Sequence, residues 1–174
     1  MEIDIKLEGI DKVVAKMRPD IYKKSLNKTL NDIGSKVKTQ STKAVRQRYN
    51  IKAKTVKDNM QVKRSRYSDL SFALHIASGR RNIINFGARQ VKKGVNVKVK
   101  KTSGVKLVKG AFIGNNGRTV FKRVKDKRLP IKAIKTLSIP QMFNKDIMQE
   151  VDKDASSNFN KRFKTNFEFY ISKA

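Results

Sequence analysis

Two long amphipathic segments restrict the folds open to this chain more than any other feature of its sequence. Apolar side chains recur at spacings of three, four or seven over residues 20–48, and at intervals of four over residues 140–168. These spacings predict two helices, each on the order of 40 Å long at ~1.5 Å per residue. Helices of this length are typical of subunits that pack against a neighbouring copy. The candidate subunit-packing residues on the two apolar stripes are Leu26, Leu30, Ile33, Val37, Ile147, Val151, Phe159 and Phe163.

Between the two predicted helices, the sequence is typical of strands. Residues 70–76 and 95–99 alternate apolar side chains with polar or small ones. Turn residues at 101–104 and 115–118 predict two hairpins, the second with an Asn-Gly step. We therefore predict an α+β fold, with an antiparallel sheet of four to six strands and two long amphipathic helices.

The ends of the chain complete this expected architecture. Residues 2–7 alternate Ile3, Ile5 and Leu7 with charged side chains, which predicts one more strand. The length of 174 residues suits a single domain, so we expect one domain over residues 1–174, with its C-terminal helix at about 140–168. No stretch approaches the roughly 18 apolar residues of a membrane span, and we expect a soluble protein without a membrane partner.

Positive charge is concentrated in the predicted strand region. The chain has a net charge of +28, and residues 59–144 hold 21 Lys and Arg against two carboxylates, Asp69 and Asp126. Lys98, Lys100 and Lys106 are expected on one face of the sheet. Such an excess predicts contact with a polyanion or with acidic neighbours. The candidate contact residues are Arg89, Lys92, Lys93, Lys98, Lys100, Lys101, Lys106, Arg118, Lys122 and Arg123.

Three interpretations of this cationic surface stay open at the level of sequence. It can contact phosphate backbones, with an affinity that falls steeply with salt. It can contact an acidic protein, or it can be a solvated face that protects a sheet edge from aggregation. Sequence-specific reading of nucleic acid is not indicated, because the chain has no helix-turn-helix spacing, no zinc-ligand pattern and no aromatic-studded strand.

The sequence offers little for catalysis. It has no cysteine and one histidine, His75, in the middle of a predicted strand. Metal-dependent nucleases gather several carboxylates around the cation, whereas Asp69 and Asp126 are 57 residues apart. Gly110 and Gly114 lack the lysine of a phosphate-binding loop. We therefore predict no enzyme, no cofactor, and no catalytic or metal-binding residue.

Four short pieces, read in order, carry a resemblance to a known family. Their order and spacing are similar to those of the phage minor tail protein Z family, the tail-completion proteins of long-tailed phages and prophages, over about residues 15–150. The pieces are VRQRYNIKAKTV at 45–56, INFGARQVKKGVNVKVKK at 84–101, KGAFI at 109–113 and LPIKAIKTLSIPQMF at 129–143.

The resemblance implies a structural protein of the virion, present in the host cytoplasm during assembly. It implies a late role at the head-proximal end of the tail, where a ring of subunits helps to join tail to head and DNA passes through. The implied partners are further copies of the chain, a tail terminator or tube protein, head connector proteins, and genome DNA contacted non-specifically. The alternative from charge alone is a free basic nucleic-acid-binding protein of ribosomal or nucleoid type.

Overall fold

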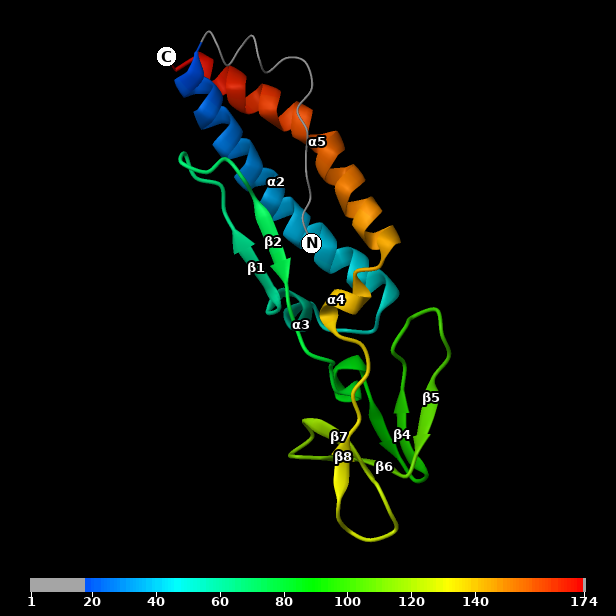
Figure 1. The fold of residues 1–174 in the computed structure, drawn as a ribbon. Helices are drawn as coiled ribbons and strands as arrows, with labels where there is room; N and C mark the ends of the chain where they lie inside the picture. The colour runs from blue at the N-terminus through cyan, green and yellow to red at the C-terminus, as the bar shows by residue number, and fades with distance from the viewer. Residues whose placement is uncertain (1–17, 174) are drawn as a thin grey trace. The chain divides into compact units, whose positions relative to one another are not determined.

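The computed structural model describes residues 18–173 (Figure 1), and these form two compact units. The described part of unit 1 consists of residues 18–41, 60–76 and 145–173, and unit 2 consists of Thr42–Asn59 and Ala77–Asn144. The strand predicted over residues 2–7 lies outside the described residues. A single domain over residues 1–174 stays a prediction.

The predicted α+β class and the two long helices are confirmed, but the strands are divided among three small antiparallel sheets. The sheets have the orders β1–β2, β3–β4–β5 and β6–β7–β8. The helices are α2 (Pro19–Arg48), α3 (Ala53–Lys57), α4 (Ile139–Met142) and α5 (Lys145–Ile171), with a 3-10 turn η1 (Ile83–Phe86). The strands are β1 (Met60–Lys63), β2 (Ala73–Ile76), β3 (Arg89–Val91), β4 (Gly94–Val97), β5 (Lys106–Lys109), β6 (Ala111–Gly114), β7 (Thr119–Arg123) and β8 (Ile131–Ala133).

In unit 1, α5 lies along α2 (Figure 1). The rings of Tyr22 and Phe163 meet edge to face, with centroids 5.7 Å apart. Phe159 stacks on Phe163 at 6.3 Å and is 2% exposed. The stripe of apolar residues at every fourth position of α5 therefore forms part of the core of unit 1. The buried members of that stripe are Ile147, Val151, Ala155, Phe159 and Phe163.

The second predicted helix is two helices. Ser138 caps α4 through a capping box with Gln141, so the predicted start is confirmed. The helix then stops, because Phe143 takes a ψ of 72°, outside the helical range. A new helix, α5, begins at Lys145. Periodicity hides this break because Met142 and Ile147 are both fully buried and continue the apolar stripe across it.

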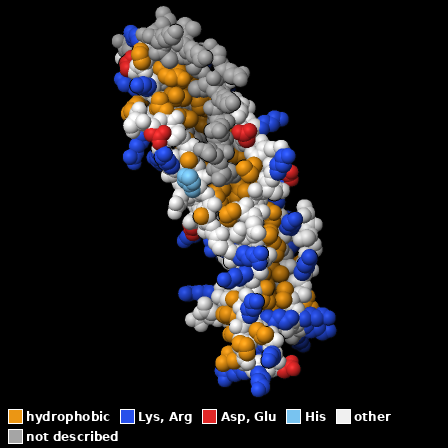
Figure 2. Space-filling model, in the orientation of Figure 1, with side chains coloured by type: hydrophobic (Ala, Val, Ile, Leu, Met, Phe, Trp, Pro, Cys, Tyr) orange, Lys and Arg blue, Asp and Glu red, His pale blue; other side chains and the backbone are white. Residues whose placement is uncertain are grey.

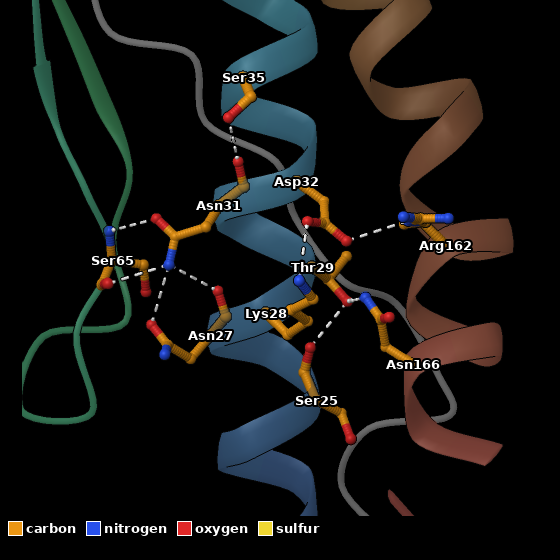
Figure 3. A network of polar contacts seen from close by, with 10 residues as sticks. All are labelled: Ser25, Asn27, Lys28, Thr29, Asn31, Asp32, Ser35, Ser65, Arg162 and Asn166. Carbon is orange, nitrogen blue, oxygen red and sulfur yellow. Dashed lines mark hydrogen bonds and ion pairs between the residues drawn. The ribbon is translucent and has the colours of Figure 1, made fainter. Parts of the chain in front are cut away.

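Polar contacts join α2 to α5 and to the segment after β1 inside unit 1 (Figure 3). The Asn166 amide donates to the Thr29 hydroxyl at 3.0 Å, and that hydroxyl donates to the Ser25 carbonyl oxygen at 2.7 Å. On another side of α2, the Asn31 amide donates to the Ser65 carbonyl oxygen at 3.1 Å and its oxygen accepts from the Ser65 N–H at 3.1 Å. These bonds fix the position of α5 and of the segment after β1 on α2.

We expect Asn166→Ala to lower the free energy of unfolding by about 1–2 kcal/mol, because the buried Thr29 hydroxyl loses its donor. Chemical denaturation of the full chain measures this loss. Asn160 is exposed on the same helix, so Asn160→Ala serves as the control and should change stability by less than about 0.5 kcal/mol. Equal losses in the two variants would contradict a role for the buried amide.

In unit 2, three amide side chains connect different segments of the chain. The Gln90 oxygen accepts from the Ile113 N–H at 2.8 Å, which ties the sheet β3–β4–β5 to β6. The Asn82 oxygen accepts from the Val120 N–H at 2.9 Å, and the Asn50 amide donates to the Phe86 carbonyl oxygen at 3.0 Å. The core beneath these contacts includes Val95, Val120, Phe86 and Met142, all fully buried.

Both predicted hairpins are confirmed. Strand β4 pairs with β5 across residues 98–105, and β6 pairs with β7 across residues 115–118. Asn115, Asn116 and Gly117 have φ values of 52°, 51° and 80°, the left-handed backbone that Asn and Gly adopt most readily. Tyr49, directly after α2, is 6% exposed, and its backbone bridges to Lys100 in the connection between β4 and β5.

Candidate interaction surface of unit 2

The excess positive charge belongs to unit 2. This unit holds 24 Lys and Arg against two carboxylates, Asp58 and Asp126, so it carries +22 of the chain's +28. Figure 2 shows Lys and Arg side chains gathered over its strands with hydrophobic side chains between them. A concentration of this size on one small unit creates a potential that attracts anions from solution.

Most of the cations proposed to contact a partner are accessible to solvent. Nine of the ten candidate contact residues are exposed, and Lys98 is half-buried. None of the 18 Lys and Arg in residues 77–144 pairs with a carboxylate of the described chain. Asp69, by contrast, lies in unit 1, where Lys63 at 2.8 Å bonds to it and lowers the pKa of its carboxyl group.

The expectation that Lys98, Lys100 and Lys106 share one face is wrong for Lys106. In the β4–β5 register Lys106 is opposite Val97, and Leu107 is opposite Asn96. Directly opposed residues of an antiparallel pair point to the same face, so Lys106 lies on the side of Val97. Sequence alternation assigns faces within one strand, but the register that relates two strands is set by the turn between them.

A hollow in unit 2 collects cations that the sequence did not single out. Arg46 from the end of α2, Lys52 before α3 and Arg118 from the β6–β7 turn line a space of about 680 Å³. Only Arg118 was among the candidates. Arg46 and Lys52 lie in the piece VRQRYNIKAKTV, but their spacing along the chain gives no signal that they converge with a turn some 70 residues later.

The outer face of the sheet β3–β4–β5 is amphipathic. A second hollow there, of about 510 Å³, is lined by Arg89, Val91, Asn96, Lys98 and Val105, among others. Next to it, Leu107 is 40% exposed and Val105 is 64% exposed. This surface therefore offers hydrophobic area and positive charge together.

The eight candidate subunit-packing residues lie in unit 1. All are buried there except Leu30, which is half-buried. Because these side chains are already covered within one chain, they could join subunits only if the packing of unit 1 opened. A subunit interface built on them stays a prediction.

The part of the chain that the structure describes contains no cluster of three or more His, Cys, Asp or Glu able to hold a metal ion. His75 is exposed on β2, opposite Gln61. None of the helices in residues 18–173 combines the length and the apolar composition of a membrane span.

The motif pieces of the sequence have structural roles in this fold. Asn50 and Gln90 make the backbone contacts described above, and Gly87 has a φ of 69° beside the Asn50 amide, which a Cβ would approach to 2.9 Å. The family model described as prophage minor tail protein Z (GPZ) matches residues 5–173. No curated protein sequence and no solved structure gives a significant match.

Proposed function

The chain belongs to the prophage minor tail protein Z family, and from this premise we propose that it completes the head-proximal end of a phage tail and helps to join tail to head. It acts as an oligomeric ring around the DNA path, in the virion, after assembly in the host cytoplasm. Its partners are further copies of itself, the tail terminator or tube protein, head connector proteins and, non-specifically, genome DNA. Its role is structural, not enzymatic.

The observation that supports this proposal, beyond family membership, is the concentration of positive charge in unit 2. Unit 2 carries a net charge of +22, and none of its cations in residues 77–144 pairs with a described carboxylate of the chain. Such a surface attracts anionic partners in an assembled particle. The DNA phosphates and acidic surfaces of neighbouring proteins are such partners, and contact with either weakens as salt rises.

We expect the variant K98E/K100E/K106E to fold but to give tails that do not join heads productively. Infectious titre in the phage that carries the gene should fall by at least about tenfold, a loss equivalent to ~1.4 kcal/mol or more of assembly free energy. Circular dichroism checks the fold, and electron microscopy counts joined and free tails.

The control changes the same amount of charge in unit 1. Lys23, Lys24 and Lys36 are exposed on α2, and K23E/K24E/K36E should leave head joining near the level of the unmodified chain. Fully infectious particles from K98E/K100E/K106E would overturn the proposal. An equal defect in both variants would mean that net charge, and not the surface of unit 2, decides assembly.

A further inference from the structure

Strand β5 presents an open edge. In the order β3–β4–β5, β4 occupies one side of β5, and no described strand pairs with the other side. Lys106, Leu107 and Lys109 of this strand are exposed. An exposed edge strand with apolar side chains is a site where an extended segment of another chain adds by backbone hydrogen bonds.

The side chains around this edge favour an acidic protein segment over nucleic acid. Val105 and Leu107 are 64% and 40% exposed beside the hollow that holds Arg89 and Lys98. Phosphate backbones satisfy cations but do not remove valine and leucine from water. A segment that alternates carboxylates with aliphatic side chains does both, because successive side chains of a strand point to opposite faces.

The chain itself contains one segment of this composition. Residues 2–8 carry Ile3, Ile5 and Leu7 in alternation with charged positions, three of which are the acids Glu2, Asp4 and Glu8. This segment lies outside the described residues. Its three carboxylates, against the single Lys6, oppose the charge of the rest of the chain.

We propose that residues 2–8 of one copy add as a strand to the free edge of β5 in a neighbouring copy. The apolar side chains would then neighbour Val105 and Leu107, and the acids would neighbour Lys106. Such a contact joins different surfaces of identical chains, which closes into a ring when the rotation allows. It rests on the proposed ring function, and it gives a chain of +28 an attractive contact with its own copies.

The absence of cysteine allows a direct test on the full chain. Cysteine replaces Leu107 in one preparation and Ile3, Ile5 or Leu7 in another, and the two preparations carry tags of different size. Only contact between two copies can form the mixed disulfide. Opposed residues of paired strands are ~4.5–5.5 Å apart at Cα, within the range that a disulfide spans.

The matched control places the cysteine at Val62, which is 36% exposed on β1, instead of at Leu107. For at least one of the three donor positions, mild oxidation should give at least about tenfold more mixed disulfide with L107C than with V62C. The reason is that docking of the donor segment on β5 raises the local concentration of its thiol near residue 107. A synthetic peptide of residues 1–11 should lower that yield. Equal yields with L107C and V62C overturn the proposal.

Two further variants separate the possible occupants of β5. A chain with cysteines at both the donor position and Leu107 should form ladders of linked copies, and a disulfide confined within single chains overturns the assignment to a neighbouring copy. K106E should lower the yield of the mixed disulfide, because Lys106 lies on the face of β5 that the acids would occupy, and E2K/D4K/E8K in the donor should restore it. The proposed function and the strand addition can fail separately. If K98E/K100E/K106E blocks head joining but L107C forms no mixed disulfide with any donor, the proposed function is supported and the strand addition is wrong.

Discussion

Replacing Gly94 with alanine is expected to open the sheet β3–β4–β5 and to lower the free energy of unfolding by at least about 3 kcal/mol. Gly94 has a φ of 148°, which side chains rarely adopt. A Cβ there would overlap the Val108 carbonyl oxygen and lie 3.1 Å from the Lys109 Cα. Both contacts are with the backbone of β5, which cannot turn aside as a flexible side chain can. Strands β4 and β5 must therefore separate, or the turn between β3 and β4 must rearrange.

Chemical denaturation measures this loss, and amide hydrogen exchange in β4 and β5 locates it. Gly104, in the connection between these two strands, provides the control. A Cβ there would meet nothing within 4 Å, and Gly104 is not among the glycines with positive φ. Gly104→Ala should therefore change stability by less than about 1 kcal/mol. Similar losses at the two glycines would mean that the close approach of β4 and β5 is not what Gly94 permits.

The helices of this fold could be predicted from the sequence because their signal is local. Pro19 and Asp20 mark the start of α2, and the Ser138 cap marks α4. The break between α4 and α5 was missed because it depends on one backbone angle at Phe143. The buried residues on either side keep the helical spacing, so the apolar pattern alone cannot reveal it.

The strands could also be predicted from the sequence, but the pairing between them could not. Alternation identifies a strand and its two faces, whereas pairing depends on contacts between distant residues. The division between the sheets β3–β4–β5 and β6–β7–β8 falls at Gly110, whose φ of 69° turns the chain between β5 and β6. The sequence shows a glycine there but not the direction of the turn, which is why one sheet of four to six strands was expected.

The candidate surface was predicted as a region of charge but not as a geometry. The concentration of Lys and Arg in residues 59–144 corresponds closely to unit 2. The placement of Lys106 on the side of Val97 required the register of β4 with β5, and the convergence of Arg46, Lys52 and Arg118 required the fold of the whole unit. Charge can be counted along a chain, whereas a hollow exists only once distant segments meet.

The amphipathic outer face of β3–β4–β5 narrows the partners that were open at the level of sequence. A purely cationic face suits phosphates or solvent, but Val105 and Leu107 are poorly matched to both. The same combination recurs around β7, where Arg123 lies 5.2 Å from the centre of the Phe112 ring and opposite Ile131, which is 39% exposed. Cations and apolar side chains are therefore neighbours on both three-stranded sheets of unit 2.

Phe159→Ala is expected to have the largest effect in unit 1, a loss of about 3–5 kcal/mol in the free energy of unfolding. The Phe159 ring is 2% exposed and stacks on Phe163, with 7° between the ring planes. Truncation removes the ring from the core and leaves a cavity. The contacts of Asn166 with Thr29 and of Arg162 with Asp32 hold α5 on α2, so the two helices can close this cavity only in part. Because whole domains are stable by only ~5–15 kcal/mol, this loss should be plain in a denaturant titration followed by far-ultraviolet circular dichroism.

Phe169→Ala is the matched control, since Phe169 is on the same helix but is 49% exposed. Its ring meets Tyr170 and the Lys173 ammonium and is otherwise largely open to solvent, so its truncation should cost less than about 1 kcal/mol. If the two variants unfolded at the same denaturant concentration, the contact of α5 with α2 would not be a main source of stability. The apolar stripe of α5 would then be available for packing between subunits, as its sequence alone suggested. A large loss at Phe159 alone instead assigns that stripe to the interior of each chain and leaves subunit contact to exposed surfaces such as the edge of β5.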